Sequence, residues 1–376
     1  MREIHVIEDG ALLITDGVIQ YVGPSRRLEK LAEARRAEEL DASGRVVMPG
    51  FVDCFTQLLC GPPRMPDEPG GAFASSCRTF HSWSAQRLEL EGRKRLRQFV
   101  RLGSTTVGAS SGYGLNEEGE LRSLRALDRL QDRPVAVAPL LYTTAETWQG
   151  TPGSPGELLE MLGTATLPAA HGKRLLGGVV IGAGFPADAV EGYLACAARL
   201  GLTSCVETKG DSVTLARRAY AGALMDLDSL TPAQLQAVGE SEAVAILLPG
   251  RTFQSGSGPF APARGLIDHG AAVALATGYD SLTSPTASLP MVMALACKQM
   301  RMTPEEALTA VTVNAAHALG FGARLGSLQY GMQADLLVMD CSDYREIPLY
   351  FGMNPVAIVM TRGQTIFPRL AATRDL

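Results

Sequence analysis

Three carboxylates and a tyrosine follow short apolar segments of the sequence, and these side chains can do chemistry. Glu207, Asp228 and Asp280 could act with Tyr113 as an acid–base pair, or could hold Mg²⁺ or Mn²⁺ through oxygen ligands. They would meet if the apolar segments are strands of one barrel, because the strand ends of a barrel open onto one face. The alternative, which we favour, is that the carboxylates are scattered and solvated or pair with Lys209 and nearby arginines. Tyr113 could equally cap a turn.

The thiols and imidazoles of the chain do not suggest a second set of catalytic groups. The seven cysteines are scattered and form no Cys-x-x-Cys pair, which indicates reduced thiols in a cytoplasmic protein. Cys54 and Cys205 lie inside predicted strands, with no histidine beside either to activate a thiolate. None of the five histidines follows a predicted barrel strand, so we interpret them as surface or structurally hydrogen-bonded side chains.

The composition argues against several classes of protein. Hydrophobic residues make up 46% and charged residues 19% of the 376 residues, and the formal net charge is −5. This balance is typical of a soluble globular protein, and no basic tract predicts nucleic-acid binding. Because the sequence contains no apolar run of 18 residues and starts without an apolar segment, neither membrane insertion nor secretion is expected.

Eight short apolar segments alternate with helical patterns through the middle of the chain. They cover residues 51–54, 105–109, 135–140, 178–181, 203–206, 223–225, 243–248 and 272–276. Alternating strands and helices predict a parallel sheet with right-handed crossovers, and eight is the number of strands in a (β/α)8 barrel. We therefore predict an α/β fold with a TIM-like barrel over residues 50–323.

Both ends of the chain predict β-strands without intervening helices. The β-rich runs cover residues 11–14, 17–23, 45–48, 334–340, 357–361 and 364–367. Strands from the two ends could pair with each other. We predict that residues 1–49 and 324–376 build one small composite β-sandwich beside the barrel.

Helix signals are clearest in four places. Leucines recur at helical spacing from Leu121 to Leu130, and residues 187–200 are alanine-rich and amphipathic. Thr231-Pro232-Ala233-Gln234 and Thr303-Pro304-Glu305-Glu306 each place a capping threonine before proline, with Gln or Glu positioned for a capping box. Residues 75–97 exceed a minimal connection and predict either a lid or a plain surface excursion.

Several local motifs are shared with a known family. They are Gly103-Ser104-Thr105-Thr106-Val107, Ser111-Gly112-Tyr113-Gly114-Leu115, Leu247-Leu248-Pro249-Gly250, Pro262-Ala263-Arg264 and the block 288–320. Through them the chain resembles the amidohydrolase superfamily and, within it, imidazolonepropionase, the imidazolone-ring-opening enzyme of histidine degradation. The resemblance spans nearly the whole chain.

The resemblance implies a mononuclear metal site that this sequence does not reproduce. Such enzymes hold the metal with His-x-His after strand one, one histidine after each of strands five and six, and aspartate after strand eight, and the metal supplies hydroxide from its bound water. The corresponding positions here are Phe55, Gln57, Glu207, Asp228 and Gly278. Because phenylalanine and glycine offer no donor, we expect no metal cofactor. The alternative is a single Zn, Fe, Mn or Mg ion held by carboxylates.

The same resemblance implies a substrate pocket at the strand ends. The family uses the tyrosine at the position of Tyr113 near its substrate, and Arg64 matches, displaced by one residue, an arginine that grips a substrate carboxylate. Gln57 and Thr144 fall at further pocket positions, Thr144 in place of a histidine after strand three. The catalytic glutamate expected shortly after strand five reads Gly210.

Two functions remain open on this sequence. The first is a pseudoenzyme that has lost metal-dependent hydrolysis and keeps a pocket for a small ligand or a surface for a partner, as a homodimer or in a complex with an active relative. The second is an active hydrolase of a small cyclic amide or imidazolone, using carboxylate-bound metal or an acid–base pair without metal. Acid–base catalysis alone contributes roughly 10² to 10⁴-fold, which makes the second function the weaker one.

Overall fold

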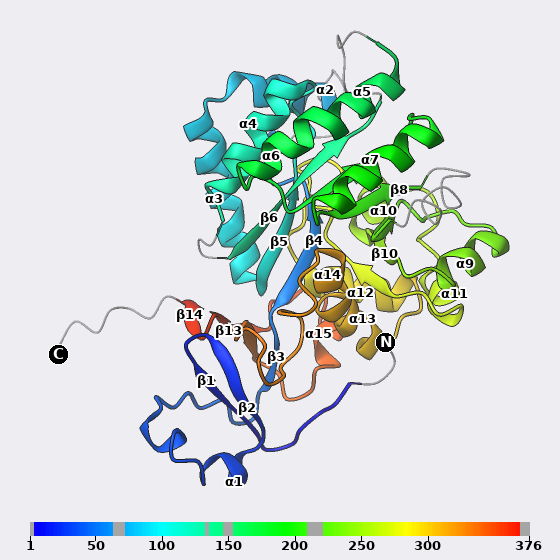
Figure 1. Cartoon of the computed structure of the whole chain (residues 1–376). Coiled ribbons are helices and arrows are strands. Elements are labelled where there is room, and N and C mark those ends of the chain that lie inside the picture. The colour runs from blue at the N-terminus through cyan, green and yellow to red at the C-terminus, as the bar shows by residue number, and fades with distance from the viewer. Residues whose placement is uncertain (1–3, 63–71, 132–134, 146–152, 209–220, 369–376) are drawn as a thin grey trace.

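The computed structural model describes residues 4–62, 72–131, 135–145, 153–208 and 221–368. It contains one large barrel of strands and helices, and two smaller antiparallel sheets lie together at one end of it (Figure 1). The predicted fold class is therefore confirmed. Within the described residues, none of the helices is both long and apolar enough to cross a membrane.

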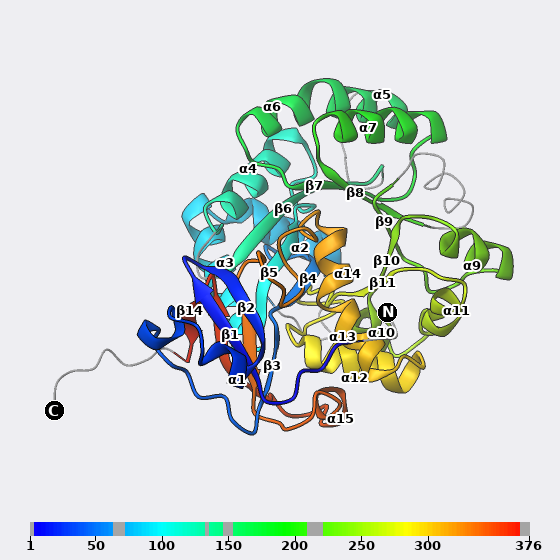
Figure 2. The same ribbon diagram turned by 60° about the horizontal axis from the view of Figure 1, so that its bottom comes forward.

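Eight parallel strands form the barrel, one in each segment where the sequence predicted a strand. They pair in chain order and are β4 (Phe51–Thr56), β5 (Ser104–Ser110), β6 (Ala136–Thr143), β7 (Gly178–Ile181), β8 (Thr203–Glu207), β9 (Ala223–Met225), β10 (Val244–Leu247) and β11 (Val273–Leu275). Figure 2 shows these strands curving into a ring with helices outside it.

The barrel closes between its first and last strands through backbone hydrogen bonds. The Gly278 amide donates to the Phe55 carbonyl at 3.1 Å, and the Gln57 amide donates to the Tyr279 carbonyl at 2.7 Å. Thr56 and Tyr279 form a parallel bridge between these two bonds. Three positions that the sequence assigned to a lost metal site, Phe55, Gln57 and Gly278, thus form the barrel seam.

Helices cover the outside of the barrel and one end. They are α2 (Ala72–Ser82), α3 (Ala85–Arg101), α4 (Glu117–Asp128), α5 (Pro155–Met161), the π-helix η2 (Leu162–Thr166), α6 (Leu167–Gly172), α7 (Ala187–Arg199), α9 (Pro232–Gly239), α10 (Pro249–Ser255), α11 (Ala263–Asp268), α12 (Leu289–Gln299), α13 (Pro304–Ala310), α14 (Val313–Ala318) and α15 (Glu346–Leu349). Residues 75–97, for which the sequence left two interpretations, belong to α2 and α3 apart from residues 83 and 84 between the two helices. Helix α14 contacts β4, β10 and β11.

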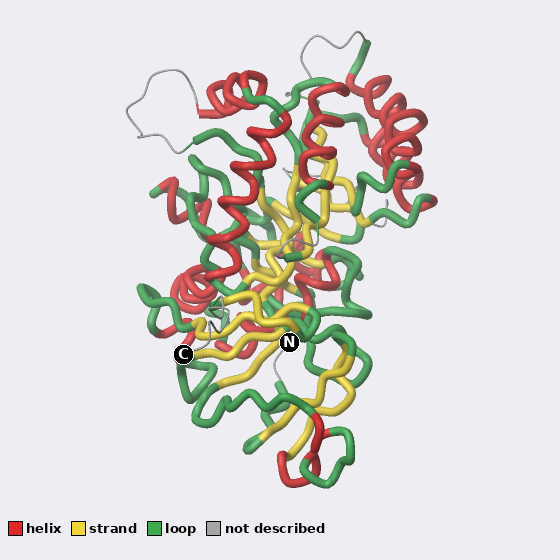
Figure 3. Tube along the Cα trace, turned by 90° about the vertical axis from the view of Figure 1, so that its left-hand side faces the viewer, coloured by secondary structure: helices red, strands yellow, loops and turns green. Residues whose placement is uncertain are grey.

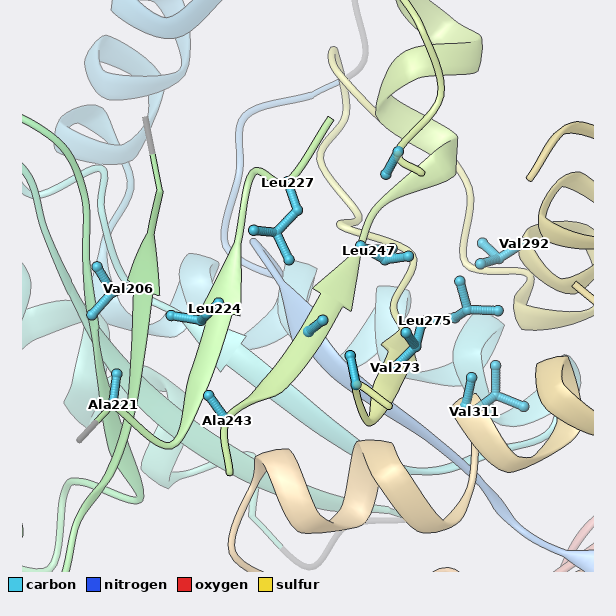
Figure 4. Packing of buried hydrophobic residues seen from close by; sticks show 14 of the residues in the cluster. Val206, Ala221, Leu224, Leu227, Ala243, Leu247, Val273, Leu275, Val292 and Val311 are labelled. Carbon is cyan, nitrogen blue, oxygen red and sulfur yellow. The ribbon is translucent and has the colours of Figure 1, made fainter. Parts of the chain in front are cut away.

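The strand side chains alternate between two cores. On β7, Val180 belongs to the core inside the barrel, whereas Val179 and Ile181 pack outward under the helices. The same alternation separates inward Cys205 from outward Val206 on β8. Figure 4 shows part of the outer core, where strand side chains face the surrounding helices. Both faces of each strand are buried, which explains why the segments read as continuous apolar runs.

Strands from both ends of the chain form the two smaller sheets (Figure 3). One sheet is a hairpin of β1 (Gly10–Thr15) and β2 (Val18–Pro24); α1 (Ser25–Leu28) and the short η1 (Ala34–Arg36) follow it. The other has the order β14-β13-β12-β3, from β14 (Gln364–Phe367), β13 (Val356–Thr361), β12 (Leu336–Met339) and β3 (Val46–Pro49). The antiparallel pairing of β3 with β12 joins the two ends of the chain, as the sequence predicted.

Both predicted capping boxes are present, but their surroundings differ. At α9, Thr231 and Gln234 cap each other in an exposed position. At α13, Glu306 is 1% exposed, and its carboxylate accepts a hydrogen bond from the Thr303 amide at 2.8 Å. Both terminal nitrogens of the Arg264 guanidinium also donate to this carboxylate, at 3.0 Å each. This bidentate pair ties α13 to α11.

We expect Glu306→Ala to lower the free energy of unfolding by about 2–4 kcal/mol, because it removes a cap and leaves the Arg264 guanidinium without its bidentate partner. The exposed equivalent, Gln234→Ala, should cost about 1 kcal/mol or less. Urea denaturation of the two variants measures the difference. Equal losses would contradict the role of the Arg264 contact.

Candidate functional site

The loop that carries Tyr113 is built around a buried carboxylate. Glu120, on α4, accepts hydrogen bonds from the backbone amides of Gly112 at 2.8 Å, Gly114 at 2.7 Å and Leu115 at 3.2 Å. Burial raises the pKa of Glu120, and these hydrogen bonds oppose that rise. A Cβ at Gly114 would approach Gly119 of the same helix to 2.3 Å, so this close approach of loop and helix requires glycine. Three hydrogen bonds and one close backbone contact therefore attach the loop after β5 to α4.

Tyr113 brings together two of the other predicted site residues. Its hydroxyl donates to a carboxylate oxygen of Asp280, and its oxygen lies 2.9 Å from Oε1 of Gln57. The ring packs at 5.9 Å from the ring of Phe73. Burial, and then the Asp280 charge, raise the pKa of Tyr113 well above its usual value. Tyr113 thus stays protonated and links the loop after β5 to both sides of the barrel seam.

The Asp280 carboxylate accepts hydrogen bonds from its own loop. Its Oδ1 accepts from the backbone amides of Leu282 at 2.8 Å and Thr283 at 2.9 Å, while Oδ2 accepts from Tyr113. Such an arrangement fixes a turn, as aspartate side chains commonly do. The Asp280 carboxylate therefore serves the loop after β11 and does not face Glu207 or Asp228 as a further metal donor.

Glu207 ends β8 and opens onto the barrel mouth. Its Oε2 accepts from the Tyr142 hydroxyl at 2.9 Å, and burial followed by the Glu207 charge raises the pKa of Tyr142. A Cβ added at Gly182 would approach both Glu207 Oε2 and Thr144 Cβ to 2.9 Å, so these two predicted site residues are neighbours. Glu207, Thr144 and Tyr142 form one polar cluster.

An arginine occupies the space between the positions predicted for a lost metal site. The Arg251 guanidinium carbon lies 5.4 Å from the ring centre of Phe55, and Nη1 lies 3.3 Å from Oδ1 of Asp226. A Cβ at Gly278 would lie 3.4 Å from Arg251 Nε. Asp226 has a φ of 61°, a backbone conformation that is uncommon outside glycine and found at functional sites. Arg251 therefore borders Phe55 and Gly278 directly.

The three candidate carboxylates do not converge. Asp228 is exposed, Glu207 faces Tyr142, and Asp280 is held by its own loop. Across the described ranges, no group of three or more His, Cys, Asp or Glu side chains is placed to hold a metal ion. Although Asp228 is exposed as a residue, partial burial of its carboxyl group, and then the charge of Asp226, raise its pKa.

A metal ion therefore does not fit those side chains of the barrel mouth that the structure describes. Phe55 and Gly278 provide no donor atom, and Arg251 places a permanent positive charge beside both. Arg64, Lys209 and Gly210 lie outside the described residues, so the carboxylate grip predicted for Arg64 remains a prediction.

A buried aspartate supports the seam from inside the barrel wall. Asp53 on β4 accepts from the Thr277 backbone amide at 3.1 Å and from the Thr277 hydroxyl at 2.5 Å. The Thr277 hydroxyl in turn accepts from the Tyr279 amide at 3.1 Å. Complete burial raises the pKa of Asp53 to about 7, against the lowering effect of the Thr277 hydrogen bonds.

Sequence reasoning missed Arg251, Asp226 and Tyr142. The alternation of β6 could have identified Tyr142, because it lies two residues after the inward-facing Leu140. Asp226 directly follows β9, at the end of the barrel where site residues lie. Arg251 follows the motif 247–250 immediately, but nothing local indicates that its side chain reaches Phe55.

Comparison with known proteins adds the family context. The model of the Amidohydrolase family matches residues 251–366. The imidazolonepropionase of Solibacter usitatus (strain Ellin6076) is 35% identical over 393 residues, covering 99% of this chain and 94% of that protein. The imidazolonepropionase of Geobacillus thermodenitrificans (strain NG80-2) is 33% identical and covers 97% of this chain and 92% of its own length.

Solved structures share the fold at lower identity. Guanine deaminase of E. coli superposes with a TM-score of 0.72 at 14% identity, covering 97% of this chain and 93% of that one. An adenosine deaminase from Xanthomonas campestris with bound zinc has a TM-score of 0.66 at 19% identity, covering 96% and 88%. These structural similarities show that this chain shares its fold with both deaminases.

Proposed function

The chain belongs to the imidazolonepropionase family of amidohydrolases, and we propose that it is a member without metal-dependent hydrolysis that binds a small molecule at the barrel mouth. One observation carries the proposal. The Arg251 guanidinium, paired with Asp226, lies against Phe55 and beside Gly278, in the space where relatives would place donors for a metal. A permanent cation in that space is incompatible with a second, divalent cation.

The remaining polar groups are poorly suited to replace the lost chemistry. Tyr113 has a raised pKa and donates to Asp280, so it is a poor base. Asp280 accepts from its own loop as well as from Tyr113. Glu207 remains as a candidate proton acceptor, but it already accepts from Tyr142. Acid–base catalysis without metal is worth roughly 10² to 10⁴-fold, far below typical enzymatic accelerations.

The polar groups suit binding better than hydrolysis. Four polar residues lie at the ends of four different strands, and each contacts another polar group: Gln57, Tyr113, Thr144 and Glu207. A preorganised set of donors and acceptors lowers the entropic cost of ordering these side chains when a ligand binds.

We propose in addition that the protein acts as a homodimer, on the basis of the family resemblance. Analytical ultracentrifugation at micromolar concentration tests this, and a monomer would contradict it.

A second function is favoured by the relatives themselves. Identities of 33–35% over nearly the entire chain are those of proteins named imidazolonepropionase. This supports an active hydrolase of an imidazolone or another small cyclic amide, working through Glu207 or through a single metal ion on carboxylates. The two functions differ in whether the purified protein turns over substrate and in whether it contains a bound metal ion.

Elemental analysis distinguishes the two functions. The protein is purified without chelator from one culture without added metal and from one supplemented with Zn, Mn and Fe. We expect less than about 0.1 metal ion per chain in both, and no turnover of 4-imidazolone-5-propionate above the uncatalysed rate. Stoichiometric metal, or turnover that Glu207→Gln abolishes, would overturn the proposal and establish the hydrolase.

A further inference from the structure

Arg251 lies beside two of the positions that the resemblance assigns to metal ligands, Phe55 and Gly278. Its guanidinium lies 5.4 Å from the Phe55 ring centre, and its Nε lies beneath Gly278. Nε is buried and has no hydrogen-bond partner among the residues that the structure describes. Burying an unsatisfied donor is costly, so this placement calls for a compensating interaction. The ion pair with Asp226 and the Phe55 ring face provide it.

The electrostatics of the barrel mouth place Arg251 among the acidic groups. The positive charge of Arg251 acts on Asp228, on Tyr142 and on the thiol of Cys205, each time in the direction that stabilises the negative form. The negative charge of Glu207 acts on the same tyrosine and thiol. The charge of Arg251 therefore acts on side chains from β6 and β8 and on Asp228, which follows β9.

We infer that Arg251 is a built-in cation that takes the place and the charge of a metal ion at the barrel mouth, and that it excludes divalent cations from that place. The inference rests on the proposed function, because it explains how the barrel mouth keeps its charges balanced without a metal. Arginine suits this task because it stays protonated at all physiological pH values and is weakly hydrated. It also supplies five donors in one plane, of which Asp226 takes one.

A metal ion could be excluded by the positive charge of Arg251 or by the absence of donor side chains, and these two causes predict different results. If missing donors alone exclude the metal, restoring donors restores binding whatever residue stands at position 251. If Arg251 excludes the metal, restored donors bind it weakly until the guanidinium is removed. A charge of +1 within about 5 Å of a divalent ion is repulsive enough, even at an effective dielectric constant of 20, to weaken binding by at least about 100-fold.

The test introduces imidazoles at positions 55 and 57, two of the positions that the resemblance assigns to metal ligands. Phe55→His and Gln57→His are combined, first with Arg251 retained, then with Arg251→Met, which keeps most of the bulk, and then with Arg251→Ala. Isothermal titration with ZnCl₂ measures the dissociation constant of each protein. We expect both substitutions of Arg251 to tighten zinc binding by at least about 100-fold relative to the double variant that keeps Arg251.

The matched control replaces an arginine with a similar ion pair far from the barrel mouth. Arg45, which pairs with Asp340 at 3.4 Å, is exposed, and Arg45→Met in the double-imidazole protein should leave zinc binding unchanged. Thermal unfolding checks that each protein is folded. Because Phe55 is buried in the inner core, Gln57→His alone is measured in the same backgrounds as a milder variant.

Three results would overturn the inference. The first is equal zinc affinity with and without Arg251, and the second is no zinc binding in any of the proteins. The third is zinc binding in the Arg251→Ala protein but not in the Arg251→Met protein, because that result would assign the exclusion to the volume of the side chain and not to its charge. Failure of the proposed function looks different, because stoichiometric metal or turnover would then occur in the unaltered protein.

Discussion

We expect Glu120→Ala to lower the free energy of unfolding by about 3–5 kcal/mol, because two buried backbone amides and one partly buried amide lose their acceptor at once. Those amides, of Gly112, Gly114 and Leu115, belong to the loop 112–115, and all three donate to the Glu120 carboxylate. Glu120→Gln keeps one acceptor oxygen and should lose less. Urea denaturation gives the free energies.

Loss of Glu120 should also release Tyr113 from Asp280, since the loop positions the phenol. The matched control is Glu118→Ala on the same helix, where the side chain is exposed and the cost should stay within about 0.5 kcal/mol. If Glu120→Ala costs no more than Glu118→Ala, the loop after β5 is held by something other than this carboxylate.

The second large effect is a pH dependence that Asp53 imposes on stability. Its pKa in the folded protein is about 7, above the value of 3.8 expected for an unfolded chain. Between these values the folded protein keeps a proton that the unfolded chain has released, so stability falls as pH rises and levels off above pH 7. From pH 5 to pH 8 the loss is about 2–3 kcal/mol.

Asp53→Asn should remove this pH dependence while keeping an acceptor for Thr277. The measurement is the difference in the free energy of unfolding between the variant and the unaltered protein, taken at pH 5 and at pH 8. Asp340→Asn serves as an exposed control and should leave the pH slope unchanged. An unchanged slope in Asp53→Asn would show that Asp53 is ionised in the folded protein at pH 5.

The sequence predicted the barrel well because its signals are local and repeated. Segments such as 178–181 and 244–247 are buried on both faces, so composition alone marks them as strands of a covered parallel sheet. The capping boxes at Thr231 and Thr303 depend on four consecutive residues, and both occur. The order of parallel strands then follows from chain order.

The candidate site was harder to predict because its contacts are long-range. Tyr113, Gln57 and Asp280 come from three loops, and their meeting depends on how the barrel closes. Asp280 was predicted as a candidate donor, yet its own loop satisfies it two and three residues later. Arg251 reaches Phe55 across the seam, and no pattern in a single sequence reports which way a long side chain extends.

The barrel seam separates assembly from chemistry. Its hydrogen bonds join main-chain atoms of Phe55, Gln57, Gly278 and Tyr279, and main-chain atoms are the same whatever side chains the residues carry. The seam hydrogen bonds themselves therefore do not depend on which side chains these residues carry, although Phe55 also packs in the inner core and Gly278 has a φ of 56°. An architecture of this kind lets a reactive centre be dismantled, or rebuilt, one residue at a time while the protein continues to fold.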